Sequence, residues 1–349
     1  EYYLKYISKS SITNGKFEAL MSWAFWNLSH KEYTHFLNIS SEFLEAEVQS
    51  LDFPKSRYLP EFTSNMGHLG FLTSYIGYYS KFEPSRVINL WPDKAPNKYF
   101  MKLILEQTPI KINTITKGLS ELGLPLHHKD NLAFSITSSR KVRIEHCSAS
   151  YTGESFPELE DGFKLKFTGD DEKNIKSLVS IGFNPNKWFT ILHIRGPRSG
   201  GSKLDQTRDT YVENYSDFCK VIQDLGGQVV RMGGKFFSKL DPAFQAIDYA
   251  HSDIKSEELD CWLWANCKWW TGNASGASLA AYAFGAKRLI TDQWFWDSVG
   301  PSQDFFMPRV LVQNNRTLSI KETLNSRLSR NMNQKKFISQ NSFVSLNSN

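Results

Sequence analysis

Basic, small and hydroxyl residues stand at or just after the ends of three apolar runs, WFTILHIR, QVVRM and CKWWTG. They are His193, Arg195, Arg231, Ser275, Gly276 and Ser278. Guanidinium groups, hydroxyls and the unpaired N–H groups of a helix N-terminus all bind phosphate oxygens. These residues would hold a diphosphate if the fold brings the ends of the runs to one place.

The stretch KWWTGNASGAS, residues 268 to 278, is the most informative of these. An apolar run breaks into small and hydroxyl residues and resumes as the helical SLAAYAFGA, which predicts a strand, a tight turn and a helix beginning near Ser275. Backbone N–H groups and the hydroxyls of Ser275 and Ser278 would then point toward one ligand. The alternative is a plain turn with a helix cap.

Further polar residues lie in the segments that follow these strands. Asp248 and Asp253 flank a turn, and Arg208 ends the long loop GPRSGGSKLDQTRDT, a composition typical of binding loops. Asp253 could instead cap the helix that includes KSEEL. Asp209 could likewise cap the helix that follows the loop.

Alternatives also remain for the basic residues. Arg231 could be an ordinary surface arginine, and His193, within an apolar strand, could be a core histidine that orients its neighbours. In the first half, Gly67-His68-Leu69-Gly70 predicts a glycine turn after a strand. The imidazole of His68 could act there as a general base, or be structural.

Several chemistries are disfavoured. There is no G-x-G-x-x-G fingerprint, and Gly233-Gly234-Lys235 is followed by Phe236 where a P-loop needs Ser or Thr. GNASG lacks the G-x-S-x-G spacing of a hydrolase, and all eight histidines precede Ser275. Asp170-Asp171-Glu172 is predicted to cap a helix, so we expect no required metal and no cofactor.

Apolar runs and helical patterns alternate between residues 188 and 291. This order predicts a doubly wound parallel sheet, which binds ligands at the carboxyl ends of its strands. MPRVLV (308 to 313) is predicted to close the sheet. We therefore predict an α/β chain with four parts: an N-terminal helical hairpin (1–55), a Rossmann-like domain (56–175), a second Rossmann-like domain (176–325) and a mobile tail (326–349).

Composition sets broader limits. The chain has 349 residues, 40% of them hydrophobic, which is enough for two folded domains. The net charge of +5 is spread along the chain, which disfavours a nucleic-acid partner. Four cysteines without a C-x-x-C pair, no signal pattern and no long apolar run predict a reduced, cytoplasmic protein without a transmembrane segment.

The runs GHL, ILHIR, GGQVVRMG, IDYAHSD, KSEELD and WWTGNASGAS resemble a bacterial family of glycosyltransferases from surface-polysaccharide and related glycan loci. The resemblance covers roughly residues 60 to 295 and extends distantly to the fucosyltransferase-like branch of the GT-B fold. Two features depart from it: Asn273-Ala274 stands where a Thr/Ser-Ser pair is common, and the glycine-rich loop after Arg195 is unusual.

The resemblance implies two Rossmann-like domains facing a cleft and transfer of a sugar from a nucleotide-sugar co-substrate, GDP-linked donors included, to a glycan or other hydroxyl acceptor. Arg195 would stabilise the leaving diphosphate, with Arg231, Ser275 and Ser278 around the donor and Asp253 near its nucleoside or the reacting centre. Inversion of configuration is implied by analogy. Two other functions stay open: a non-catalytic nucleotide- or glycan-binding protein, and a scaffold that assembles with itself or a partner through the N-terminal helices.

Overall fold

The structure is a computed structural model of the chain. It describes residues 35, 57–58, 65–82, 87–90, 93, 95–114, 132–136, 142–146, 163–196, 209–273, 275–293, 304–325 and 342–344. Of the predicted N-terminal hairpin (1–55), only residue 35 falls within these ranges, and Arg208 lies outside them. No helix in the described ranges has the length and apolar character that crossing a bilayer requires.

The chain divides into two compact units. Unit 1 comprises Glu1–Met101 and Leu105–Gly162, and unit 2 comprises Lys102–Ile104 and Phe163–Asn349. The main division therefore falls before Phe163, upstream of the position after residue 175 at which the sequence analysis separates two domains. The helix that begins at Asp171 belongs to unit 2, because Trp262 in a later helix of this unit donates a hydrogen bond to the Asp171 carboxylate at 2.7 Å.

Unit 1 contains a mixed sheet in the order β3-β2-β1-β4-β5. The first three strands pair in parallel, and the last two pair antiparallel. Helices separate the parallel strands along the chain, as β-α-β connections require. The elements are β1 (Arg57–Tyr58), α4 (Met66–Phe82), β2 (Ile88–Leu90), α5 (Lys98–Gln107), β3 (Ile112–Thr114), β4 (Leu132–Ile136) and β5 (Val142–His146).

Unit 2 contains the predicted parallel sheet, in the order β10-β9-β8-β6-β7. All of its pairings are parallel. The strands are β6 (Phe189–His193), β7 (Gln228–Met232), β8 (Trp269–Gly272), β9 (Arg288–Gln293) and β10 (Phe305–Pro308). They are short and rich in apolar residues because both faces of such a sheet are normally covered.

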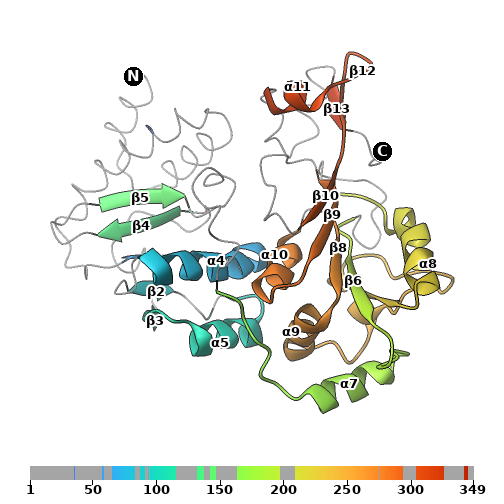
Figure 1. Ribbon diagram of the computed structural model, residues 1–349, viewed down its shortest axis with the longest axis horizontal. Coiled ribbons are helices and arrows are strands. Elements are labelled where there is room, and N and C mark those ends of the chain that lie inside the picture. Colours follow the sequence, from blue (N-terminus) through green and yellow to red (C-terminus); the bar gives the residue numbers. More distant parts are fainter. Residues whose placement is uncertain are drawn as a thin grey trace. The chain divides into compact units, whose positions relative to one another are not determined.

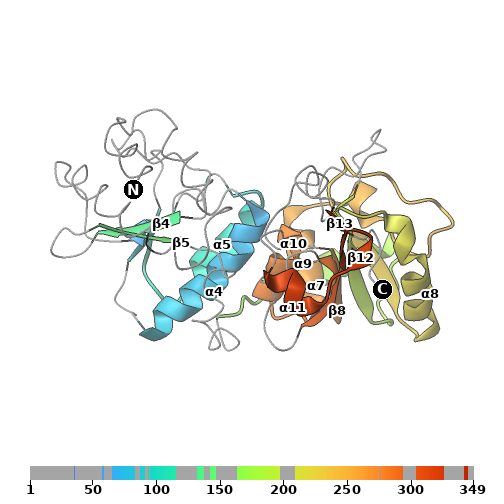
Figure 2. The ribbon, with the colours of Figure 1, turned by 90° about the horizontal axis from the view of Figure 1, so that it is seen from above.

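Helices flank both faces of this sheet (Figures 1 and 2). Helices α9 (Glu257–Asn266) and α10 (Gly276–Ala283) lie on one face, and α8 (Ser216–Asp224) lies on the other, preceded by the 3-10 turn η4 (Val212–Tyr215). α8 packs through Cys219 and Ile222 onto Leu192 and Val229 of the sheet. Doubly wound packing in unit 2 is thus confirmed.

Helix α7 (Asp171–Val179) begins where the sequence predicts a cap. Asp170 is its N-cap, and its carboxylate accepts a hydrogen bond from Lys173 N–H at 2.9 Å. The two acidic residues that follow lie in the first turn, where they favour the helix dipole. The interpretation of this acidic run as a helix start is confirmed.

The end of the chain differs from the expectation. MPRVLV does not form one sheet-closing strand, because β10 ends at Pro308 and Leu311 begins a separate sheet in the order β12-β11-β13. Its strands are β11 (Leu311–Gln313), β12 (Arg316–Thr317) and β13 (Ser342–Val344), with α11 (Ile320–Asn325) after β12. Ser342–Val344, expected in a mobile tail, therefore pair with β11 in the structure.

Candidate functional site

The order of strands in unit 2 places a topological switch point between β6 and β8. The chain runs from β6 to β7 on one side and then crosses to β8 on the other, so the connections after β6 and β8 diverge. Ligands of open α/β sheets bind at such a switch point, outside the carboxyl ends of the strands. His193 pairs with Gly272, so both strands end level. The predicted residues at the ends of β6 and β8 do meet here.

The backbones of β6 and β8 approach closely at this point. A Cβ atom at Gly272 would overlap the carbonyl oxygen of His193, so a residue with a side chain would force the strands apart. The next residue, Asn273, continues the contact with its side chain: Oδ1 accepts from Arg195 N–H at 2.7 Å, and Nδ2 donates to Arg195 O at 2.6 Å. Asn273 thereby fixes the backbone of Arg195.

Sequence reasoning noted Asn273 only as a departure from a family pattern and missed this role. The sequence did contain a signal for this role, because Asn273 directly follows the glycine that ends β8. A side-chain amide has both a donor and an acceptor, so it can make the two hydrogen bonds to a neighbouring strand that a backbone residue would make. The fully buried side chain of Asn273 makes the replacement dependable, because water does not compete for the two hydrogen bonds.

Arg195 is held at one end of its guanidinium. Nε donates to Asp209 Oδ1 at 2.7 Å, and the side chain of Arg195 is 30% exposed while that of Asp209 is 6% exposed. Within the described residues this is the one side-chain contact that the Arg195 guanidinium makes. A guanidinium anchored through Nε keeps its Nη groups for a ligand, and two Nη groups match two oxygens of a phosphate.

Asp209 is itself fixed by a buried network. Its backbone carbonyl accepts from Arg309 Nη2 at 2.7 Å, and Arg309 is fully buried after β10. Arg309 Nε lies 3.4 Å from Asp292 Oδ1, and Asp292 Oδ2 accepts from the Tyr215 hydroxyl at 2.7 Å. Burial, reinforced by Asp292, raises the pKa of Tyr215, so its hydroxyl stays protonated and donates. The network ties Asp292 of β9 and Arg309, which follows β10, to the anchor of Arg195.

Helix α10 begins where the sequence predicts. Ser275 is its N-cap, and its Oγ accepts from Ala277 N–H at 3.4 Å. The hydroxyl of Ser278 donates to Ser275 O at 2.8 Å, which uses its proton inside the first turn. The N–H of Ser278 also donates to Ser275 O, at 3.1 Å. A ligand at this end would therefore meet the Gly276 N–H and the Ser275 hydroxyl. The sequence analysis expects two hydroxyls to bind the ligand, whereas in the structure the proton of the Ser278 hydroxyl is already used.

Arg231 differs from the expected ligand-binding arginine. Its side chain is 2% exposed, Nη1 donates to Asp248 Oδ1 at 2.8 Å, and Nη2 donates to Ser238 O at 3.0 Å. Asp248 also accepts from Leu240 N–H at 3.1 Å. Burial opposes ionisation of Asp248, but the Leu240 N–H and the Arg231 guanidinium outweigh it and hold the pKa of this carboxyl below its usual value. Arg231 and Asp248 form an internal pair and hold the loop after β7.

A histidine missed by the sequence analysis completes this pair. His251 Nε2 lies 3.0 Å from Phe237 O, and Nδ1 lies 2.9 Å from Arg231 Nη1 and 3.0 Å from Asp248 Oδ2. An Nε2–H tautomer donates to the carbonyl and accepts from the guanidinium. The motif DYAHSD contains both Asp248 and His251, and their three-residue spacing was the available signal.

His193 is a neutral packing residue. Its ring stacks on Trp270 with centroids 6.1 Å apart, and its Nδ1 is buried with no hydrogen-bond partner among the described residues. Burial lowers the pKa of His193 to about 4, and the nearby Arg231 guanidinium acts in the same direction. Of the two sequence interpretations, the structure favours the core histidine, because a neutral buried ring adds no positive charge to an anion site.

Two further predicted residues are Asp253 and His68. Asp253 is fully exposed, 3.9 Å from Lys235 Nζ, and the cap of α9 is Ser256 instead. His68 lies in the first turn of α4 in unit 1, so the predicted glycine turn is wrong: Asn65 Oδ1 accepts from Gly67 N–H at 2.9 Å and starts the helix there. Burial lowers the pKa of His68 to about 4.

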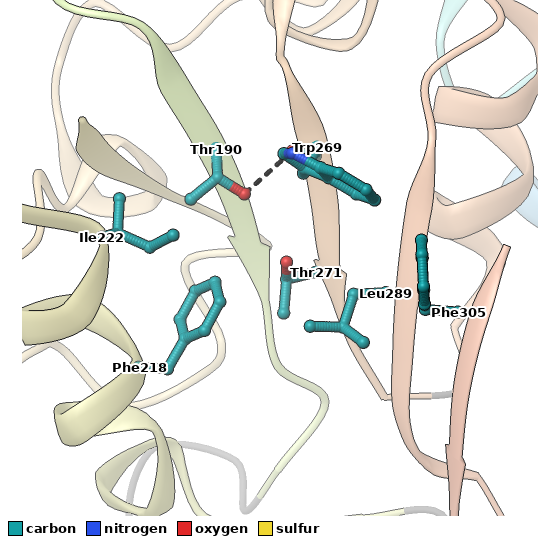
Figure 3. A pocket seen from close by; sticks show the side chains of 7 residues that line it. All are labelled: Thr190, Phe218, Ile222, Trp269, Thr271, Leu289 and Phe305. Carbon is teal, nitrogen blue, oxygen red and sulfur yellow. Dashed lines mark hydrogen bonds between the residues drawn. The ribbon is translucent and has the colours of Figure 1, made fainter. Parts of the chain in front are cut away.

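A separate cavity of about 280 Å³ lies on the α8 face of the sheet (Figure 3). Its lining consists of Thr190, Phe218, Ile222, Trp269, Thr271, Leu289 and Phe305. These side chains include two threonines and no charged group, so they offer an anion no opposite charge. Among the described residues, no three His, Cys, Asp or Glu side chains cluster as a metal site would require. The expectation that no metal is needed stays a prediction.

Comparison with known proteins gives distant structural likenesses. No family model matches the chain, and no curated protein matches its sequence. A glycosyl transferase of family 9 from Veillonella parvula has a TM-score of 0.44 at 11% identity, over 79% of this chain and 93% of that one.

Two heptosyltransferases from E. coli are also similar. ADP-heptose LPS heptosyltransferase II has a TM-score of 0.35 at 12% identity, over 79% of this chain and 87% of its own. Heptosyltransferase WaaC with ADP-2-deoxy-2-fluoro heptose has a TM-score of 0.32 at 14% identity, over 81% of this chain and 99% of its own.

Proposed function

We propose that the protein is a glycosyltransferase of the GT-B type that moves a sugar from a nucleotide-sugar donor to a glycan or other hydroxyl acceptor. The observation that carries the proposal is Arg195, a half-buried cation at the β6–β8 switch point whose Nε is anchored by Asp209. Its Nη groups and the N-terminus of α10 offer positive charge to one anion. The residues that resemble glycosyltransferases of glycan loci include this strand end and this helix start.

Sugar transfer needs the leaving diphosphate to be stabilised as the bond to the anomeric carbon breaks. Negative charge grows on the leaving oxygen in the transition state. Hydrogen-bond donors and cations that are already in place stabilise this charge most. Asp209 and Asn273 hold Arg195 before any ligand arrives. Because Arg195 and the helix N-terminus supply the positive charge, the proposed reaction is metal-independent. Inversion is part of the proposal.

The acceptor hydroxyl needs a general base, and His68 and Asp253 remain the candidates. Asp253 is an exposed carboxylate, whereas a His68 pKa of about 4 makes a neutral but weak base. This low basicity favours the second candidate function, a non-catalytic protein that binds a nucleotide or glycan on the same fold. Cytoplasmic location and a role in surface-polysaccharide synthesis belong to the first proposal.

A panel of nucleotide sugars, GDP-linked donors included, tests the proposal. We expect one donor to be turned over or hydrolysed, and Arg195→Ala to lower kcat/KM about 100-fold or more through lost charge stabilisation. Arg316→Ala is the matched control, because Arg316 is an exposed arginine of the same unit that pairs with Glu322. It should leave kcat/KM unchanged.

Calorimetry separates the alternatives. Binding of a nucleoside diphosphate without turnover of any donor would favour the non-catalytic protein. If the wild-type chain binds no nucleoside diphosphate at all, both the glycosyltransferase and the non-catalytic nucleotide-binding protein are ruled out.

A further inference from the structure

Arg309 is an arginine whose side chain has no exposed surface. It directly follows β10, whereas Arg195 follows β6, three strands away in the sheet. Burying a guanidinium costs free energy unless anions and hydrogen-bond acceptors replace the water that it loses. Because no surface of Arg309 is open to a ligand, its role must lie in the groups that it contacts.

The Arg309 guanidinium joins two segments of unit 2. Its Nη2 donates to the backbone carbonyl of Asp209 at 2.7 Å, and its Nε donates to Asp292 Oδ1 at 3.4 Å. Asp209 is the residue whose carboxylate anchors Arg195 Nε. A single planar guanidinium therefore connects the anchor of Arg195 to β9.

Asp292 has a backbone conformation that residues other than glycine seldom adopt. Its φ is 51°, in the left-handed region, which costs free energy and persists only where the surrounding structure imposes it. Both carboxylate oxygens have a donor: Oδ1 accepts from Arg309, and Oδ2 accepts from the Tyr215 hydroxyl at 2.7 Å. Asp292 is thus a fixed point to which Arg309 is attached.

The segment from Asp209 to Tyr215 is held at both of its ends. At its start, Thr210 N–H donates to Arg195 O at 3.0 Å, and a Cβ atom at Gly196 would overlap Thr210 O, so the two backbones are in close contact. At its end, the Tyr215 hydroxyl ties the segment to β9. The backbone and the guanidinium of Arg195 therefore both depend on where this segment lies.

We propose that Arg309 is a positioning residue for the anion site, which holds Asp209 so that the Arg195 guanidinium is in place before the diphosphate of the donor arrives. The inference rests on the proposed function and deepens it, because it makes phosphate binding at the end of β6 depend on groups at the ends of β9 and β10. Charges that are held in place beforehand stabilise an anion most, since they need no reorganisation. Arg309 then acts on the ligand only through Arg195.

Calorimetry on the full chain with inorganic pyrophosphate, UDP, GDP and ADP tests this role. Removing a group that orients a ligand-binding residue typically costs about 10- to 100-fold in affinity at metal sites, and we expect Arg309→Met to weaken pyrophosphate binding about tenfold. Arg309→Lys keeps the positive charge but lacks the planar fork that bonds two acceptors. It should recover little of the loss. Full recovery would show that positive charge alone matters and would overturn the inference.

A double-mutant cycle with Arg195 separates positioning from a direct effect. Arg195→Ala should weaken pyrophosphate binding by itself. In that background Arg309→Met should cause no further loss, because the guanidinium that Arg309 positions is gone. An equal loss in the presence and absence of Arg195 would mean that Arg309 acts on the ligand independently, and the inference would be wrong.

Two further variants guard against a general loss of stability. Tyr215→Phe removes only the hydroxyl that holds Asp292 and keeps the ring in the core, so it should fold and weaken pyrophosphate binding severalfold, which decides the question if Arg309→Met does not fold. Arg231→Met is the matched control, because Arg231 is another buried arginine at a strand end and pairs with Asp248. It should lower the urea midpoint and keep the affinity. A parallel loss of affinity in Arg231→Met would assign the effect to destabilisation and contradict positioning.

The outcomes distinguish this inference from the proposed function. If the wild type binds a nucleoside diphosphate and both Arg309→Met and Tyr215→Phe bind it equally well, Arg309 is purely structural, and the proposed function stands without it. If the wild type binds neither pyrophosphate nor any nucleoside diphosphate, the proposed function fails and the inference fails with it.

Discussion

Two arginines at neighbouring strand ends of unit 2 have opposite surroundings. Arg195 is 30% exposed and bonded through Nε alone, whereas Arg231 is 2% exposed and uses both Nη groups on Asp248 and Ser238. Their residue type and their positions near the ends of apolar strands are alike. The difference teaches that an arginine at a strand end binds a ligand only where the neighbouring loop leaves its guanidinium accessible. At β7 the loop folds back over Arg231, and at β6 Asp209 holds Arg195 from one side.

The largest effect should come from Arg231. Arg231→Met leaves the carboxylate of Asp248 half-buried without its cation, which should lower the free energy of unfolding by about 3–5 kcal/mol. Urea unfolding followed by tryptophan fluorescence measures this. Arg316→Met removes an arginine from an exposed pair and should leave the urea midpoint unchanged. Equal midpoints for both variants would show that Arg231 is not a structural arginine.

A pH dependence should come from His193, the neutral ring between the two arginines. Its folded pKa of about 4 lies below the ordinary value of 6.5. Between these values the unfolded chain binds a proton that the folded protein does not, so the free energy of unfolding falls as pH falls from 6.5 to 4 and is constant above 6.5. The loss is at most about 3 kcal/mol.

The variant His193→Phe isolates this contribution from that of His68, which titrates in the same window. It keeps a ring beside Trp270 but cannot bind a proton. Urea unfolding between pH 4.5 and 7 should therefore show a shallower pH slope in the variant. Identical slopes would mean that His193 is already protonated in the folded protein, contrary to its burial.

A smaller effect should come from Asn273, which holds the backbone of Arg195 and has no counterpart at Arg231 among the described residues. Asn273→Ala leaves the N–H of Arg195 without its partner, while the carbonyl of Arg195 keeps only the hydrogen bond from Thr210 N–H at 3.0 Å. The loss should lower the free energy of unfolding by about 2 kcal/mol. Because Arg195 is then less well positioned, nucleoside diphosphate affinity should fall as well, measured by calorimetry.

Asn266→Ala is the matched control for Asn273. Its Nδ2 donates to Trp262 O at the end of α9, before β8 begins, so it lies at the other edge of the sheet. This variant should lose some stability and keep its affinity. Reduced affinity in both variants would indicate a general loss of stability and contradict a positioning role for Asn273.

Much of unit 2 could be predicted from the sequence. The alternation of apolar runs with helical patterns located β6 to β9 and α8 to α10 to within a few residues, because hydrophobic periodicity is a local property. The start of α10 at Gly276 followed from the small residues before SLAAYAFGA. Local signals failed at Gly67-His68, where Asn65 caps a helix in place of the expected turn.

The site itself was only partly predictable. Arg195 and Ser275 were placed next to the correct strand ends, but the contacts of Asn273 with Arg195 and of His251 with Arg231 were missed, because each joins two different segments of the chain. Asn273 meets Arg195 across 78 positions of sequence. No local pattern contains such a contact.

The sequence by itself determined the parallel sheet of unit 2 and the strand ends at which polar residues collect, since both follow from the spacing of apolar residues along the chain. Only the tertiary structure decided which arginine is accessible. Accessibility depends on the loop from Gly233 to Asp248, which returns to pair Ile247 with Val230 and buries Arg231 beneath it. The free energy of that burial comes from contacts between the loop and the strand, whereas the side chain of Arg195 stays 30% exposed.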